Sequence, residues 1–183
     1  MKNCFIIIVL FLFPIIVFAQ NPAIDELLKR YSNAEDATIV DVTPEMLYLL
    51  AGEIAEGKDF ENLLESIKSV RILTIENKTS SEAKKGSSDS KTYSEFKKDF
   101  KKNINSSEYT KLMEVKEGGN TVQFLIKKNR KNQNNINEFL MVAIESSSAT
   151  LIYVVGDIEL KKLMDLSKSL GIKGLEGVKK FKK

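Results

Sequence analysis

The chain has 183 residues, of which 43% are hydrophobic and 29% are charged, and its formal net charge is +3. These fractions are those of an ordinary globular protein, and so small a positive excess gives no reason to expect a nucleic-acid partner. The sequence contains no histidine, and its single cysteine is Cys4. Imidazole-dependent catalytic triads and imidazole metal sites are therefore excluded.

The N-terminal segment, residues 1–19, has the pattern of a secretory signal peptide. Lys2 precedes an apolar run over residues 5–18, which is shorter than the roughly 20 residues that a membrane-spanning helix needs. Ala19 provides a small side chain at a signal-peptidase site, and polar residues follow it. We expect cleavage after Ala19, which leaves a mature chain over 20–183 with no thiol and no transmembrane span. An uncleaved anchor is the alternative, which Pro14 and the short run weaken.

The first half of the mature chain is expected to alternate between helices and strands. Apolar spacing and turn residues predict a helix over 24–31, a strand over 38–42, helices that begin near 43 and 59, and a strand over 69–76. Met46 and Leu50 fall on the stripe of the second helix that we expect to be buried. Residues 77–91 contain no large apolar side chain, so they are predicted to form an exposed loop.

Two further helices are expected, one before and one after a series of strands. Thr92 and Glu95 fit a capping box that begins the first of them. Asp157, after a turn at Gly156, is expected to be the N-cap of the second. The core-facing side chains of the two helices are predicted to include Phe96, Phe100, Leu160 and Met164.

The region between these helices is predicted to be a four-stranded antiparallel meander over residues 110–156. Apolar and polar residues alternate there, and Gly118 and Gly119 fall at the tight turn of the first hairpin. The last two strands, over 138–145 and 149–155, are apolar on both faces, so we expect helices or a partner to cover each side. The sequence therefore predicts a single α+β domain with a mixed, mainly antiparallel sheet that ends in this meander and is packed by three to five helices.

Four segments, at 69–76, 112–128, 137–144 and 151–168, read SVRILTIE, LMEVKEGGNTVQFLIKK, NEFLMVAI and LIYVVGDIELKKLMDLSK. In hydrophobic pattern and turn placement this arrangement resembles the exported Bacteroidetes family called domain of unknown function (DUF) 4252. The resemblance implies a protein of the Gram-negative periplasm or cell envelope with no established activity and no catalytic residues to carry over. It also suggests a lipid anchor, from which Cys4 departs because it sits at the start of the apolar run and not at its end.

Three carboxylates are candidates for acid/base or Ca²⁺ chemistry because each lies at the C-terminal end of a predicted strand, namely Asp41, Glu76 and Asp157. If the first two strands are parallel neighbours, Asp41 and Glu76 share the crevice where open α/β sheets bind ligands. The structural interpretation is that Asp157 caps a helix, Asp41 leads into a helix and Glu76 enters a solvated loop. The sequence alone favours this second interpretation.

Two groups of lysines are candidate contacts for an anionic polymer or a lipid headgroup. They are Lys97, Lys98, Lys101 and Lys102 on the aromatic-striped helix, and Lys179, Lys180, Lys182 and Lys183 in a basic tail over 171–183. Glu95 and Asp99 are interleaved with the first group, so a solvated helix face is its default interpretation. The end of the tail has no balancing acid, and a frayed terminus explains it equally well.

Two classes of function follow from these patterns. The first is a non-catalytic envelope module that binds another protein, its own copy or a surface polymer, with no cofactor and no metal. The second is a carboxylate-dependent hydrolase that acts on glycans or similar envelope material. Convergence of Asp41 and Glu76 in one pocket favours the hydrolase, whereas a flat apolar sheet face favours the binding module. The family resemblance favours the binding module.

Overall fold

The computed structural model describes residues 21–51, 58–78, 89–104 and 108–162. Its helices are α1 (Pro22–Tyr31), α2 (Pro44–Ala51), α3 (Lys58–Ser66) and α4 (Lys91–Asn103). Its strands are β1 (Ala37–Val42), β2 (Ile67–Glu76), β3 (Thr110–Glu117), β4 (Asn120–Lys128), β5 (Asn135–Ile144) and β6 (Ser148–Glu159). These elements lie close to the expected ones, because apolar spacing and turn residues act locally.

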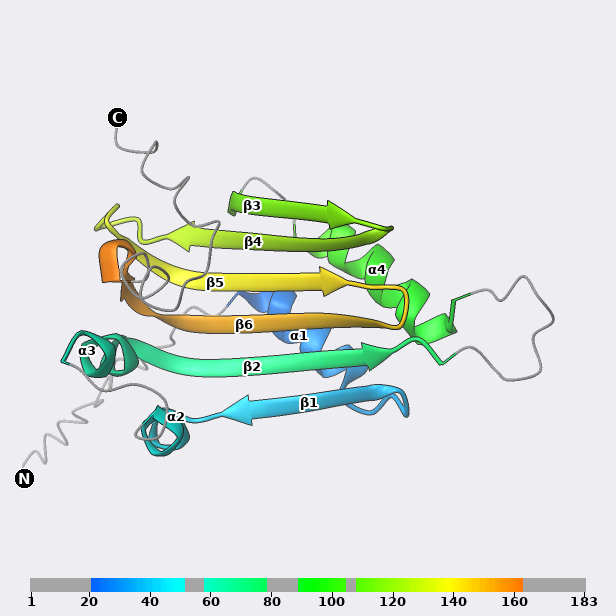
Figure 1. Cartoon of the computed structure of the whole chain (residues 1–183), viewed down its shortest axis with the longest axis horizontal. Coiled ribbons are helices and arrows are strands. Elements are labelled where there is room, and N and C mark those ends of the chain that lie inside the picture. The colour runs from blue at the N-terminus through cyan, green and yellow to red at the C-terminus, as the bar shows by residue number, and fades with distance from the viewer. Residues whose placement is uncertain (1–20, 52–57, 79–88, 105–107, 163–183) are drawn as a thin grey trace, which may run out of the picture.

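The strands form one sheet in the order β1-β2-β6-β5-β4-β3, and all five pairings are antiparallel. Helices α1 and α4 lie behind the sheet, whereas α2 and α3 lie at one end of it (Figure 1). The α+β class and the C-terminal meander of β3, β4, β5 and β6 are therefore confirmed. The expected parallel component is wrong for the described strands.

Side-chain caps begin the two helices behind the sheet. The side chain of Asn21 accepts a hydrogen bond from the Ala23 amide, and Pro22 occupies the first helical position of α1. At α4 the Ser90 hydroxyl accepts from the Tyr93 amide at 3.3 Å. The capping box expected at Thr92 is wrong, because Thr92 already lies inside the helix.

The main core fills the space between the sheet and the two helices behind it. Ile24 and Leu27 of α1 are fully buried, as are Leu73 of β2 and Leu151 of β6. The aromatic stripe of α4 contributes to the same cluster: Phe96 is 0% exposed and Phe100 is 7% exposed. The prediction that these two rings lie in the core is confirmed.

Helix α2 lies at the end of the sheet (Figure 1), and Met46, Tyr48 and Leu49 on it are exposed. Met46 is 50% exposed and Leu49 is 73% exposed, so the expectation that Met46 is buried is wrong. The reason is its position. Helix α2 follows the edge strand β1, and among the described elements it packs mainly against α3 and β2. The side chain of Leu50, predicted on the same stripe, lies outside the described residues.

Strand β6 continues past the point where a turn was expected. Gly156 lies inside β6 opposite Ile67, and Asp157 is also a strand residue, so the predicted turn and N-cap are wrong. A Cβ at Gly156 would lie 2.3 Å from the Ser66 carbonyl oxygen, so only glycine allows the end of α3 to approach β6 this closely. Helical residues 160–162 follow, and the rest of the predicted last helix, including Met164, lies outside the described residues.

Two predicted segments fall mostly outside the described residues. Residues 79–88 of the expected loop and the whole tail over 171–183 are not described. The two ends of the loop are joined by the Asn77 side chain, which donates to Asp89 at 3.1 Å and accepts from the Ser90 amide at 2.8 Å. In the described ranges no helix has the length and apolar character needed to cross a membrane.

Candidate functional site

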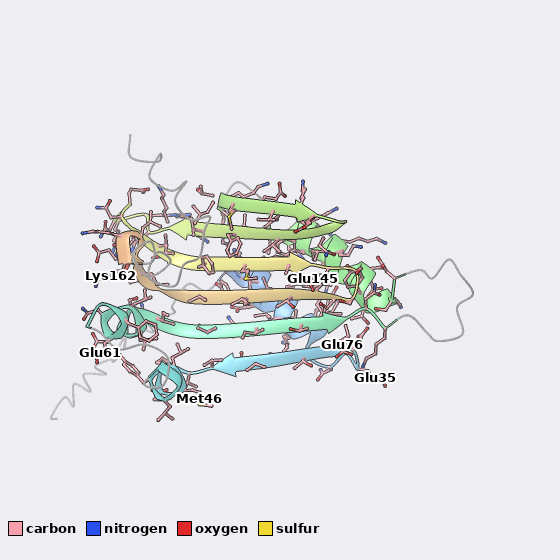
Figure 2. All side chains as sticks on the ribbon, in the orientation of Figure 1. Glu35, Met46, Glu61, Glu76, Glu145 and Lys162 are labelled. Carbon is pink, nitrogen blue, oxygen red and sulfur yellow. The ribbon has the colours of Figure 1, made fainter. Side chains whose placement is uncertain are left out.

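Two of the three candidate carboxylates lie at opposite ends of the sheet. Because β1 and β2 are antiparallel, Asp41 pairs with Arg71 near the start of β2. Glu76 is the last residue of β2 and lies at the opposite end of the sheet (Figure 2). Glu76 faces solvent there and pairs with Lys78 at 3.2 Å. The shared crevice that a parallel pairing would create is therefore absent for these two residues.

The third carboxylate, Asp157, is exposed and ties a turn to β6. It accepts hydrogen bonds from the side-chain amides of Asn129 at 3.3 Å and Asn135 at 2.9 Å. These contacts hold the connection between β4 and β5 against the end of β6. Asp157 thus has a structural partner, but in a strand and not at a helix start.

Two of the four candidate lysines on α4 border a hollow. Lys97 and Lys101 line a space of about 340 Å³ between α4 and strands β3, β4 and β5, with Phe100 and Val142 among the other lining residues. A second hollow, of about 440 Å³, lies between α2, α3 and the adjoining strands and is lined largely by apolar side chains. Neither hollow is lined by Asp41, Glu76 or Asp157.

The partners of the α4 lysines differ from what the sequence suggested. The ammonium of Lys97 donates to Asp89 at 2.9 Å and thereby holds the pKa of Asp89 below its usual range. Asp99, which we expected to neutralise the lysine face, instead accepts hydrogen bonds from Arg30 at 2.7 Å and Tyr31 at 2.8 Å. Asp99 therefore joins α4 to α1. Among the other candidates, Lys98 and Lys102 are exposed, while Lys179, Lys180, Lys182 and Lys183 lie outside the described residues.

The side of the sheet that faces away from α1 and α4 carries no charged side chain over three consecutive rows. Residues that pair across strands share a face, so the register identifies each row. From β1 to β3 the rows are Val42, Val70, Val154, Phe139, Ile126 and Thr110, then Val40, Ile72, Ile152, Met141, Phe124 and Met113, then Thr38, Thr74, Thr150, Ala143, Val122 and Val115. We call these eighteen positions the uncharged face. It is the side turned toward the viewer in Figure 1.

Coverage of the uncharged face by the described helices is confined to one end. Leu63 of α3 belongs to a small buried cluster with Ile126, against which Phe139 and Val154 of the first row also pack. The other two rows have no described helix over them (Figure 1). At their margins Val40 is 45% exposed and Val115 is 44% exposed. Apolar patches of this kind on a protein surface mark interaction sites.

A buried polar cluster, which the sequence analysis missed, lies on the opposite side of the sheet. Glu138 of β5 is only 1% exposed and accepts a hydrogen bond from the Tyr109 hydroxyl. Its other carboxylate oxygen lies 3.3 Å from the ammonium of Lys127. The amide of the Asn21 side chain donates to Tyr109 at 3.0 Å, and the Asn21 backbone N–H donates to Tyr153 at 3.2 Å. Every one of these polar groups therefore has a partner.

The signal for this cluster is present in the sequence as a break in alternation. In β5, Glu138 has the same parity as Leu140 and Val142, whose side chains are buried in the main core. A carboxylate at an inward-facing position must find a donor, because burial of an unpaired charge is costly. Neither hollow is lined by Glu138, so the cluster has the features of a structural network.

The environment of this cluster shifts the titration of its neighbours. Burial and the hydrogen bond to Glu138 raise the pKa of Tyr109 far above its ordinary value, and burial likewise raises the pKa of Tyr153. Burial disfavours the charged form of Lys127, but its hydrogen bonds to Glu108 and Glu138 outweigh this and raise its pKa. The lysine therefore stays charged and the tyrosines stay protonated at neutral pH. Across the described ranges, no group of three or more acidic side chains is placed to hold a metal ion.

Comparison with known proteins identifies a family but no activity. A family model described as Domain of unknown function (DUF4252) matches residues 31–166, which confirms the family resemblance drawn from the sequence. No curated protein and no solved structure matches the chain significantly.

Proposed function

The chain belongs to the DUF4252 family, and we propose that it is a non-catalytic module of the cell envelope that binds a protein partner through the uncharged face. The family model covers most of the chain and carries no activity with it, so the proposal rests on the geometry of this surface. The single observation that supports it is the set of three uncharged rows across six strands.

The chemistry of the uncharged face favours a protein over a surface polymer. Fourteen of its eighteen side chains are valine, isoleucine, phenylalanine, methionine or alanine, and four are threonine, so it offers few donors and acceptors to the hydroxyl groups of a glycan. Covering such hydroxyls without partners costs free energy, whereas covering apolar side chains with apolar side chains is favourable. An apolar protein surface is therefore the better complement.

The hydrolase alternative has less support. Acid/base hydrolysis by two carboxylates needs both groups beside one substrate bond, and Asp41 and Glu76 lie at opposite ends of the sheet. We expect Asp41→Asn and Glu76→Gln each to leave the biological role intact. Loss of the role in either variant, with export and folding unchanged, would favour the hydrolase over the binding module.

The location is part of the same proposal. Residues 1–19 carry the pattern of a signal peptide, so we expect the cellular protein to begin at Gln20 and to be found in the periplasmic or envelope fraction of a Gram-negative bacterium. Sequencing of the N-terminus after fractionation tests this. A protein that retains Met1 would contradict export with cleavage.

The binding proposal is tested by affinity capture from envelope extract with three forms of the tagged protein. Met141→Lys places a charge at the centre of the uncharged face, whereas Leu49→Lys makes a similar change on α2, outside that face. We expect the wild type and Leu49→Lys to retain the same partner and Met141→Lys to lose it. Equal recovery by all three forms would contradict the proposal.

A further inference from the structure

We infer that the partner of the uncharged face is a second copy of this chain, packed sheet against sheet in a symmetric dimer. The inference rests on the proposed function, because it names the occupant of the same surface. It is carried by three properties of the face, namely the absence of charge, its size and the exposed apolar side chains at both of its edges.

The absence of charge makes the face complementary to itself. In a two-fold symmetric interface the same patch meets its own copy, so any charge near the axis would face a like charge. The central positions here are Ile72, Ile152 and Met141, which follow one another across β2, β6 and β5. None of them requires a counter-charge from a partner, so a second copy satisfies the face as well as any other apolar surface.

The size of the face is that of a weak, reversible interface. Six strands about 4.8 Å apart and three rows about 7 Å apart give a flat area of roughly 400–600 Å², depending on how much α3 covers. Standard interfaces remove about 800 Å² of accessible surface from each partner, and weaker ones remove less. We therefore expect a dimer that dissociates at micromolar concentration.

The edges of the face are suited to the same arrangement. The exposed Val40 lies on edge strand β1, and the exposed Val115 lies on edge strand β3. Two sheets that pack face to face keep their strands within about 30° of each other, about 10 Å apart. If the two-fold axis runs along the strands, β1 of one copy lies over β3 of the other, so both valines leave water in the dimer.

The first measurement is sedimentation of the wild-type protein, in the form that cells yield after export, at chain concentrations from about 1 to about 300 μM. We expect a reversible change from monomer to dimer, with no larger species. A wild type that stays monomeric over the whole range would overturn the inference.

The second measurement uses opposite charges at one position. Met141→Lys and Met141→Glu should each weaken the dimer at least 100-fold, because both copies bring the same charge to the centre of the interface. A mixture of the two variants should dimerise again, since either orientation of the two-fold axis places residue 141 near the centre of the partner face. Failure of the mixture to associate while the wild type dimerises would overturn the placement of the interface.

Two further variants serve as controls. Leu49→Lys on α2 should dimerise like the wild type, which separates a specific interface from general loss of apolar surface. Val115 lies at the margin and is 44% exposed, so the monomer should tolerate a lysine there. Val115→Lys should weaken the dimer about tenfold, and it replaces Met141→Lys as the test if that variant does not fold. If the wild type is dimeric and both Met141→Lys and Val115→Lys sediment as the wild type does, the inference is overturned.

Other occupants give different results. If a heterologous envelope protein covers the face, the wild type is monomeric and Met141→Lys still loses that protein in affinity capture. That outcome overturns the inference and leaves the proposed function standing. If another segment of the same chain covers the face, Met141→Lys lowers the melting temperature of a monomer without changing its mass, which overturns both.

Discussion

The hydroxyl of Tyr109 donates a hydrogen bond to the carboxylate of Glu138 on the side of the sheet that α1 and α4 cover. Tyr109 is 6% exposed and Glu138 is 1% exposed, so water does not replace this bond when it is broken. The carboxylate also lies 3.3 Å from the ammonium of Lys127. The pair thus joins the segment before β3 to the centre of the sheet.

Tyr109→Phe is expected to lower the free energy of unfolding by about 1–3 kcal/mol. The variant removes the hydrogen bond to the buried carboxylate of Glu138 and the acceptor for the side-chain amide of Asn21. Urea unfolding followed by circular dichroism measures the change. Tyr48→Phe is the matched control, since Tyr48 is 42% exposed and its change should stay below about 0.5 kcal/mol. Equal stability of the two variants would show that the Tyr109 hydroxyl does not stabilise the fold.

Stability is expected to fall as the pH rises above about 10. Burial raises the pKa of Tyr31, Tyr109 and Tyr153 above the value of about 10 that tyrosine has in an unfolded chain. Below about pH 10 both states keep these protons, so the full stability is present. At higher pH the unfolded chain releases protons that the folded chain retains, which favours unfolding.

Urea midpoints between about pH 8 and about pH 11, together with the ultraviolet absorbance of tyrosinate, measure this dependence. Tyr109→Phe should show a weaker decline than the wild type over the same range, because it has one fewer raised pKa. A folded protein whose buried tyrosines all ionise near pH 10 would contradict the prediction.

Gly156→Ala is expected to destabilise the fold by about 1–3 kcal/mol, because the new Cβ would meet the Ser66 carbonyl oxygen at 2.3 Å. Either the end of α3 or β6 must move. Thermal unfolding measures the effect, with Ser147→Ala in the exposed turn before β6 as the control. A change at Gly156 no larger than that at Ser147 would mean that α3 shifts without cost.

Two residues that sequence pattern placed in the core are expected to respond differently to truncation. Phe100→Ala should cost about 3–5 kcal/mol, because the ring is 7% exposed and packs beside Phe96, with 6.2 Å between the ring centroids. Met46→Ala should cost less than about 1 kcal/mol, because half of Met46 faces solvent. Chemical unfolding of both variants measures the difference, and similar losses would place Met46 in a buried contact.

Local sequence pattern was sufficient for most of the elements. The spacing of Phe96 and Phe100 determined a helix with a buried aromatic side, and Gly118 and Gly119 determined the hairpin turn, where both adopt positive φ. These features depend on residues a few positions apart, so the chain decides them without reference to distant segments. The apolar pattern of the last two strands likewise indicated two faces that need cover.

Pairing between distant strands could not be obtained in the same way. β2 runs antiparallel to β1 because α2 and α3, which connect them, stay at the end of the sheet where β1 finishes, so β2 starts at that same end (Figure 1). This direction separated Asp41 from Glu76. The continuation of β6 beyond Gly156 also involves distant segments, because the end of α3 packs against this glycine from another part of the chain.

The sequence by itself thus determined most of the helices, the hairpin turn at Gly118 and Gly119, the family and the chemistries excluded by the lack of histidine. Only the tertiary structure decided that Asp41 and Glu76 lie apart, that Met46 is exposed, that Glu138 is buried beside Tyr109, and that eighteen uncharged positions form one face. The physical reason is range: turn and helix preferences act over a few residues, whereas burial and strand register depend on contacts between segments far apart in the chain.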